Sequence, residues 1–301
     1  MSWVVYALLA PMVFIVVNFI DKLIVEKEIR NPLSLPPFVG VVAALSGIIM
    51  WIVTGFPVLE LRDMLLVMSA GALHGAAATF YYKALSLEET SKLVILFQLQ
   101  PVVLLVLSFL VLGEKISPQQ LVGFVIILSA AIALSINRQA GKLRPSAAMW
   151  YAVAVVCLTS AASIIFKFVV EGSSFNKIIA YESWGLAFGC LLVYLFVPGV
   201  RPAFHATLRT ASRRAIGILC LNEGIFVIAK LLSYTAITLG PVALVSVLAG
   251  TQVFYGILIG WVLTVLAPAI YKESISRGSL LWKAAGAVVL FIGVGWINAG
   301  A

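Results

Sequence analysis

The stretch AIGILCLNEGIFVIAKLLSYTAIT, residues 215–238, decides the fold class of this chain. It has the ~20 apolar residues that a helix needs to cross a bilayer. It also carries Glu223, Lys230 and Tyr234, whose spacing of seven and then four residues places them on one helical face. A charged side chain at the bilayer centre costs ~2.5–3.5 kcal/mol, so such residues usually face a cavity or a partner. The stretch therefore predicts a membrane-spanning helix with a polar face.

The whole chain has the composition of a membrane protein. Of its 301 residues, 62% are hydrophobic and 11% charged, and the mean hydropathy is +1.12, far too apolar for a soluble domain. Its net charge of +8 comes from basic residues between apolar runs, which favours helix orientation over nucleic-acid binding. Cys157, Cys190 and Cys220 lie in apolar segments without CxxC spacing, and we expect buried free thiols, with no metal or cofactor.

Hydropathy, with Gly, Pro and charged residues as breaks, predicts ten helices. They cover residues 3–25, 36–55, 64–86, 92–112, 119–137, 148–170, 177–197, 215–238, 242–266 and 280–298. The sequence begins with no basic residue before its first apolar run and shows no small-residue cleavage site. We therefore expect the first helix to be retained in the membrane.

The chain resembles itself at two offsets. At 152 residues, Tyr82 falls on Tyr234 and Gln100 falls on Gln252. At 145 residues, the polar positions Asn18, Lys22 and Glu26 fall on Ser163, Lys167 and Glu171. The strings GEKIS (113–117) and KESIS (272–276) follow the fourth and ninth helices.

Each half therefore holds five helices, residues 1–140 and 146–301. Because five is odd, the halves enter the membrane in opposite senses. This predicts an all-α integral membrane protein of ten transmembrane helices in two inverted five-helix repeats, an arrangement used by many secondary transporters.

The loops differ strongly in charge between the two faces. One face carries Lys27, Arg30, Lys92, Arg138, Lys142, Arg144, Arg201, Arg209, Arg213, Arg214, Lys272, Arg277 and Lys283, and the other carries Arg62, Lys115 and Lys177. The positive-inside rule puts the first face in the cytoplasm, and both termini outside the cell membrane. The longest loop, 198–214, is either a short interfacial helix on anionic lipid or a plain solvated loop.

Several of these features together resemble a known family. Ten helices, two repeats, a short turn between the third and fourth helix of each, and GEKISPQQLVG (113–123) are similar to the EamA-type branch of the drug/metabolite transporter superfamily. The resemblance implies a cavity lined by helices 1, 3, 4, 6, 8 and 9 that moves small metabolites, often outward. The chain departs from it in Tyr271-Lys272-Glu273, where Gly-Glu is expected, and in the orientation, because family termini are more commonly cytoplasmic.

Two helices carry the strongest candidate site residues. Glu223, flanked by Asn222 and Phe226, is the deepest carboxylate by its distance from the helix start, and the alternative is a structural ion pair with Lys230. In the third helix, His74 is followed by Tyr81 and Tyr82. A histidine there suits proton coupling or ligand binding, and equally a plain bond between helices.

Amide side chains mark matching places in the two halves. Gln98 and Gln100 precede Pro101, which can free helix carbonyls. Gln100 and its repeat mate Gln252 could meet across the symmetry axis, or serve as interhelical glue.

Three charged side chains lie near predicted helix ends. Lys22, on the stripe of Pro11 and Asn18, and its mate Lys167 are expected to extend to the interface. If both point inward, they favour an anionic substrate. Glu182, five residues into its helix, is expected at the interface, with Trp184 beside it.

No Walker loop, HExxH motif or nucleophile–base set is present, which argues against an enzyme and excludes ATP-driven transport by this chain alone. The leading hypothesis is a secondary active transporter of small polar metabolites, amino-acid-like or related, that exports them by alternating access as a monomer or weak dimer. The alternatives are a proton-coupled multidrug or cation exporter, and a lipid-handling membrane protein or intramembrane enzyme. A small-molecule substrate, membrane lipid and a coupling proton are the expected partners.

Overall fold

The computed structural model describes residues 2–29, 31–87, 96–135, 147–256, 258–259, 285–286, 288–289 and 291–297. Within these ranges the chain consists of helices and their connections, and no residue is in a strand. The prediction of an all-α chain is therefore confirmed for the described residues.

The described helices of the first half lie between residues 3 and 135. They are α1 (Trp3–Leu23) with a π-helical end (Ile24–Glu28), a 3₁₀ turn (Pro32–Ser34), α2 (Leu35–Val53), α3 (Leu61–Leu87), α5 (Leu99–Leu107) with a π-helical end (Ser108–Leu112), and α6 (Pro118–Ser135). Those of the second half are α7 (Ala147–Gly172), α8 (Phe175–Phe196), α9 (Val200–Thr210), α10 (Arg213–Leu239) and α11 (Val242–Ala249).

Six helices in the described part are long and apolar enough to cross a membrane. They run over Trp3–Glu28, Pro32–Val53, Leu61–Leu87, Ala147–Gly172, Phe175–Phe196 and Arg213–Leu239. Shorter apolar helices cover Leu99–Leu112, Pro118–Ala130 and Val242–Gly256, where the fourth, fifth and ninth spans are predicted. Parts of the fourth, fifth, ninth and tenth spans lie outside the described residues, so the number ten stays a prediction.

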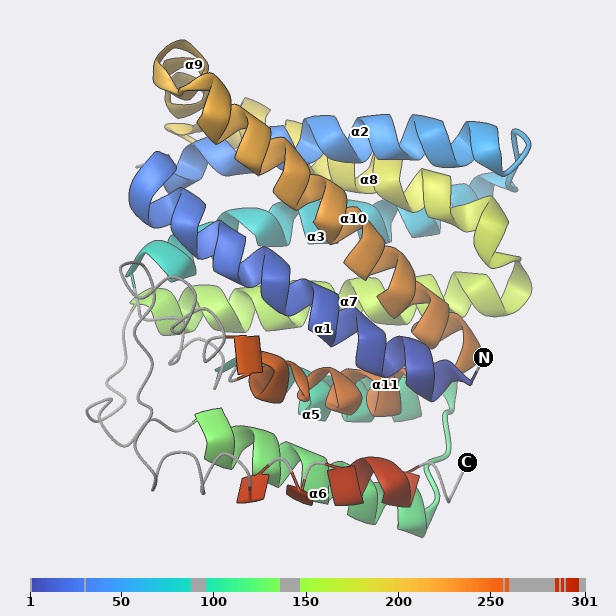
Figure 1. Ribbon diagram of the computed structural model, residues 1–301. Coiled ribbons are helices and arrows are strands. Elements are labelled where there is room, and N and C mark those ends of the chain that lie inside the picture. Colours follow the sequence, from blue (N-terminus) through green and yellow to red (C-terminus); the bar gives the residue numbers. More distant parts are fainter. Residues whose placement is uncertain are drawn as a thin grey trace.

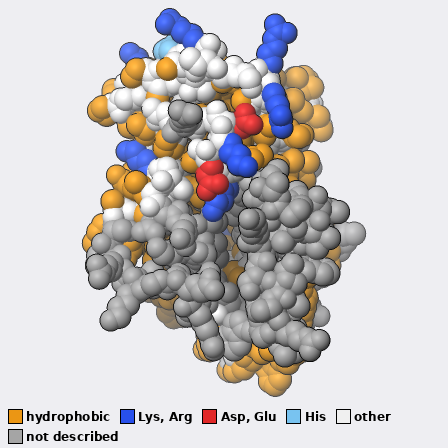
Figure 2. All heavy atoms as spheres, turned by 60° about the vertical axis from the view of Figure 1, so that its left-hand side comes forward, with side chains coloured by type: hydrophobic (Ala, Val, Ile, Leu, Met, Phe, Trp, Pro, Cys, Tyr) orange, Lys and Arg blue, Asp and Glu red, His pale blue; other side chains and the backbone are white. Residues whose placement is uncertain are grey.

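The loop 198–214 contains a helix, α9. Its buried residues Val200, Ala203 and Thr207 face the protein, whereas Arg201 and Arg209 are exposed. Figure 2 shows the end of the molecule on which α9 lies, and Lys and Arg side chains gather there. The loop is therefore helical, and the position of this helix on anionic lipid stays a prediction.

The long helices pack in pairs that join the two halves (Figure 1). α3 lies against α7 and α8, and α8 also covers α2. α1 lies against α10 and α11, and α5 lies against α11 and α7. α6 contacts residues 291–297, where Gly123 lies close to Gly293. Every long helix of one half thus has its main partner in the other half.

Glycines let α3 and α8 meet backbone to backbone. A methyl group at Gly71 or Gly75 would overlap the α8 backbone, and one at Gly185 or Gly189 would overlap the α3 backbone. Small residues at such positions allow membrane helices to approach closely. We call these four glycines the glycine seam.

α10, which carries the deciding stretch, has defined ends. Ser212 caps its start, because the Ser212 hydroxyl accepts a hydrogen bond from the Ala215 amide at 3.0 Å. It ends at Gly240, whose backbone is extended, and Pro241 leads directly into α11. Between these ends, α10 presents its polar residues to α1, α3 and α8.

Candidate functional site

Two groups of buried polar side chains lie along α10. Glu223 belongs to one and Lys230 to the other, seven residues further along. At ~1.5 Å per residue the two positions are ~10 Å apart along the helix. Because seven residues are close to two helical turns, both side chains face the protein interior but meet different neighbours.

The first group lies where α1, α3 and α10 meet, and we call it the acidic cluster. Its members are Asp21, Tyr81, Tyr82, Asn222 and Glu223. The Tyr82 hydroxyl lies 3.2 Å from Asp21 Oδ1 and 3.4 Å from Glu223 Oε1. The Tyr81 hydroxyl lies 3.1 Å from Asp21 Oδ2, and the Asn222 amide donates to Asp21 Oδ1 at 2.9 Å. Asp21 is therefore the centre of the cluster.

Both carboxylates of the acidic cluster are buried, and neither has a basic partner in the part of the chain that the structure describes. Asp21 and Glu223 are each 4% exposed. The ion pairs found among the described residues are Lys22–Glu26, Lys167–Glu171 and Lys230–Glu182, and none of them includes Asp21 or Glu223. A buried charge is costly unless it is both paired and hydrogen-bonded, so the arrangement favours uptake of a positive species.

The acidic cluster also has more acceptors than donors. Tyr82 has a single hydroxyl proton but lies within hydrogen-bond distance of carboxylate oxygens of both Asp21 and Glu223. Asn222 is fully buried, and its Oδ1 has no partner among the described residues. A bound proton or a cationic hydrogen-bond donor would supply what is missing.

The second group joins α3, α8 and α10 and is called the ion-pair cluster; its members are His74, Glu182, Ser183, Lys230 and Tyr234. Lys230 Nζ lies 2.7 Å from Glu182 Oε2 and donates to the Ser183 hydroxyl at 3.1 Å. The Tyr234 hydroxyl donates to Glu182 Oε1 at 2.8 Å and lies 3.3 Å from His74 Nδ1. Each charge here has an opposite charge and a second polar contact.

An aromatic ring closes the ion-pair cluster on the α7 side. Phe166 stacks on Tyr234 with ring centroids 3.9 Å apart and planes inclined by 9°. Glu182 is fully buried, and Lys230 is 6% exposed. The cluster is thus electrically balanced and tightly enclosed.

The expected helical stripe of α10 is divided between the two clusters. Glu223 contacts Tyr82, Lys230 contacts Glu182, and the two do not form the ion pair considered as an alternative. His74 lies near Tyr234, as expected for a shared site, and not near Glu223. Asn18 accepts a hydrogen bond from Tyr81 at 3.3 Å, at the edge of the acidic cluster.

The interfacial position expected for Glu182 is wrong. The residue lies near the start of its helix, but α2 and α3 pack over that part of α8 and bury it. Asp21 was not among the residues selected from the sequence. A signal for it existed, because Asp21 follows Asn18 by three residues on the same face of an apolar helix.

The two repeat-mate lysines lie in different surroundings. The Lys22 side chain is 38% exposed and lies 3.6 Å from Glu26. Lys167 does not extend to the interface: it is 7% exposed and donates to the carbonyl groups of Ile237 and Gly240. The cause is the unsatisfied carbonyl groups at the end of α10, which attract a cation.

Gln100 and Gln252 do not form the expected pair. Both are partly exposed, and no hydrogen bond joins their amides. α5 and α11 do pack together, so the two segments meet although these side chains do not bond. Among the described residues, no group of three or more His, Cys, Asp and Glu side chains is placed to hold a metal ion.

Comparison with known proteins gives a family for the first half. Residues 1–136 match the EamA-like transporter family. One solved structure, described as the crystal structure of a protein, covers 97% of this chain and 99% of its own, with a TM-score of 0.62 and 16% identity. That likeness shows a shared fold. No curated protein gives a significant match. With its long apolar helices, the chain is a multi-pass membrane protein.

Proposed function

We propose, on the premise that residues 1–136 match the EamA-like transporters, that this protein is a secondary active transporter. It exports a small polar metabolite, amino-acid-like or related, across the cell membrane by alternating access. The observation that carries this proposal is the acidic cluster: Asp21 and Glu223 are buried between helices of both halves and lack a basic partner among the described residues.

The acidic cluster suits a coupling or substrate site because of its position as well as its charge. Asp21 comes from α1, Tyr82 from α3 and Glu223 from α10, so a movement of α10 relative to α1 and α3 changes its geometry. A species bound there would be felt by three helices at once. A ligand can shift a conformational equilibrium only through such differential contacts.

The packing of the two halves supports two inverted repeats. α1 runs away from the end marked N, whereas α7 starts at the opposite end (Figure 1). α1 packs on α10 and α11, and α7 packs on α3 and α5, the counterparts expected from the repeat. The matched Tyr82 and Tyr234 each contact a carboxylate of another helix.

The orientation that we propose is based on the distribution of basic residues. In it, the basic end seen in Figure 2 faces the cytoplasm and both termini lie outside. We propose a monomer or weak dimer that needs lipid and substrate but no cofactor.

The second candidate is a proton-coupled exporter of organic cations. The unpaired carboxylates Asp21 and Glu223 favour it, because a proton and a cation could then occupy the acidic cluster in turn. In a metabolite transporter, the acidic cluster binds only the coupling proton. In a cation exporter, the substrate itself competes with the proton for the cluster, so the two candidates differ in whether substrate and proton compete.

The test begins with a thermal-shift screen of the purified protein against metabolites and organic cations. The best ligand is then used for flux measurements in liposomes, with and without a pH gradient. We expect Glu223→Gln to keep the fold and lose the response to the gradient. Glu26→Gln is the matched control, since its carboxylate is 58% exposed. Wild-type gradient dependence in Glu223→Gln would remove Glu223 from the mechanism.

A further inference from the structure

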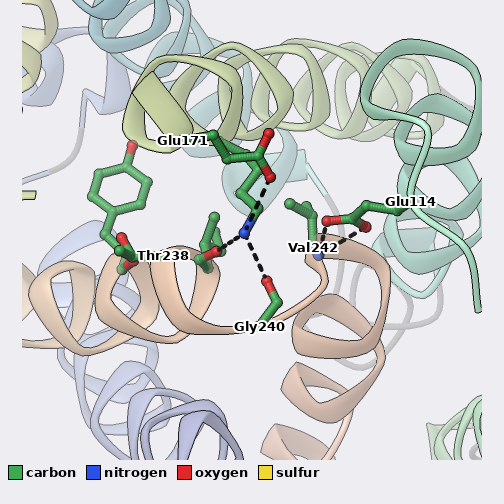
Figure 3. Close-up of polar contacts among 8 residues, drawn as sticks. Glu114, Glu171, Thr238, Gly240 and Val242 are labelled. Atoms are coloured by element: carbon green, nitrogen blue, oxygen red, sulfur yellow. Dashed lines mark hydrogen bonds and ion pairs between the residues drawn. The ribbon is translucent and has the colours of Figure 1, made fainter. Parts of the chain in front are cut away.

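Opposite charges from two neighbours hold the turn between α10 and α11 (Figure 3). Lys167 of α7 donates to the Ile237 carbonyl at 3.0 Å and to the Gly240 carbonyl at 3.2 Å. Glu114, between α5 and α6, accepts from the Val242 amide through both carboxylate oxygens, at 3.0 and 3.1 Å. We call Lys167, Glu114 and this turn the turn clasp.

Each charged side chain of the turn clasp forms hydrogen bonds with backbone groups at a helix end. The last carbonyl groups of α10 have no partners within the helix, and neither has the first amide of α11. The end of α10 carries partial negative charge and the start of α11 partial positive charge, so Lys167 and Glu114 have the correct signs. No side chain of the turn caps α11, because its N-cap residue is Pro241.

The turn clasp joins elements that are far apart in the sequence. Lys167 lies 70 residues before Ile237, and Glu114 lies 128 residues before Val242. Gly240 also lies against Trp3 at the start of α1, where a methyl group would overlap the indole ring. Four parts of the chain therefore meet at the end of the molecule where α1 begins.

The repeat mate of Lys167 lies near the opposite end of the molecule. Lys22 is 38% exposed and lies 3.6 Å from Glu26 on its own helix, and Lys167 lies at the same distance from Glu171 on its helix. Lys167 is in addition buried and donates to two carbonyl groups at the end of α10. The turn that follows α3 and corresponds to the clasp, residues 88–95, lies outside the described residues.

We propose that the turn clasp is the closed gate on the N-terminal face, and that Lys167 and Glu114 must release the α10–α11 turn before this face opens. The inference rests on alternating access in the proposed function, and it names the contacts that one state has and the other lacks. The structure is then closed at the clasp.

The test measures access to both ends in the same purified protein. In a background with Cys157, Cys190 and Cys220 replaced by serine, a single reporter cysteine is placed at Thr238 beside the clasp. A second protein carries it at Asn18, near the other end. The rate of maleimide labelling in detergent reports how often each position is reached, and no substrate is needed.

We expect Lys167→Met to raise the labelling rate at position 238 by at least about tenfold, because it removes two charge-assisted hydrogen bonds and one such bond already shifts a two-state equilibrium by about that factor. The rate at position 18 should fall in the same variant. Glu114→Gln should act in the same direction but less strongly, because its amide oxygen can still accept from Val242. Lys115→Gln, next to Glu114 but exposed, should change neither rate.

The opposite movement of the two rates separates a gate from a structural brace. If both rates rise together, the contacts only stabilise the fold and the proposal is wrong. If neither rate moves in Glu114→Gln and Lys167→Met proteins that elute as the wild type does, the proposal is wrong as well. A shift in labelling without any substrate flux would support the gate while removing the proposed transport function.

Discussion

The acidic cluster and the ion-pair cluster share α10 and are similarly buried, but they differ in charge balance. In the ion-pair cluster, Lys230 neutralises Glu182, and Tyr234 donates to the remaining carboxylate oxygen. In the acidic cluster, Asp21 accepts from Tyr81, Tyr82 and Asn222, and Glu223 competes with it for the proton of Tyr82. The charges of the ion-pair cluster are balanced within the chain, whereas those of the acidic cluster have no basic partner among the described residues. A buried charge is therefore a functional signal only where its partner is missing.

The repeat shows how this difference is built into the sequence. At the offset of 145 residues, Asp21 falls on Phe166, and at 152 residues Tyr82 falls on Tyr234. In one half the tyrosine contacts a carboxylate from the first helix, and in the other it stacks on a phenyl ring 3.9 Å away. The same framework thus holds a polar contact in one half and an apolar one in the other.

The largest effect on stability is expected when the ion pair of the ion-pair cluster is removed. Lys230→Met should lower the free energy of unfolding by about 3–5 kcal/mol, because it leaves Glu182 buried and unpaired. Chemical unfolding in detergent micelles measures this. The double variant with Glu182→Gln should recover most of the loss, and a single variant as stable as the wild type would show that the pair contributes little.

The next effect compares the two matched tyrosines. Tyr234→Phe should cost about 1.5–3 kcal/mol, since its hydroxyl donates to a charged and fully buried carboxylate. Tyr82→Phe should cost less than about 1 kcal/mol, because its contacts of 3.2 and 3.4 Å are longer and shared. The same unfolding assay decides, and equal losses would contradict the difference between the clusters.

A smaller effect is expected when one acid of the acidic cluster is neutralised. Asp21→Asn should change stability by no more than about 1 kcal/mol, because relief from the second carboxylate offsets the weaker hydrogen bonds. Transport in liposomes should nevertheless lose its dependence on the pH gradient. A loss of stability as large as that of Lys230→Met would mean that the two clusters have the same role.

The smallest effect concerns Lys22. Its side chain is 38% exposed in a pair within one helix, so Lys22→Met should change stability by at most about 0.5 kcal/mol. The same replacement at its mate Lys167 should cost more, because two helix-end carbonyl groups lose their donor. Thermal unfolding of the two variants side by side checks this order.

The sequence predicts the helices better than the partners of their side chains. The expected spans 148–170 and 215–238 lie within the observed Ala147–Gly172 and Arg213–Leu239, because apolar length and breaking residues are local signals. Glu182 was misplaced because distance from a helix end says nothing about which helices cover that end. Asp21 lies on the same helical face as Asn18, so the sequence held a signal for it. Glu223 and Tyr82 were both predicted from their positions in apolar helices, but their contact with each other is visible only in the fold.

The contacts of Lys167 and Glu114 could not be predicted from either half alone. Each lysine of the repeat lies near a helix end in the sequence, and only the fold decides whether a neighbouring helix ends beside it. α10 ends beside Lys167. The burial of Lys167 beside this helix end is therefore a property of the fold, and the repeat in the sequence cannot reveal it.

The glycine seam has a mechanical consequence. At Gly71, Gly75, Gly185 and Gly189, only hydrogen atoms separate the α3 and α8 backbones. No side chains lie between the helices there that could change rotamer and let one helix slide along the other. We therefore expect α3 and α8 to move as one rigid body, although they belong to different halves, so the hinges of the molecule do not coincide with the boundary between its repeats.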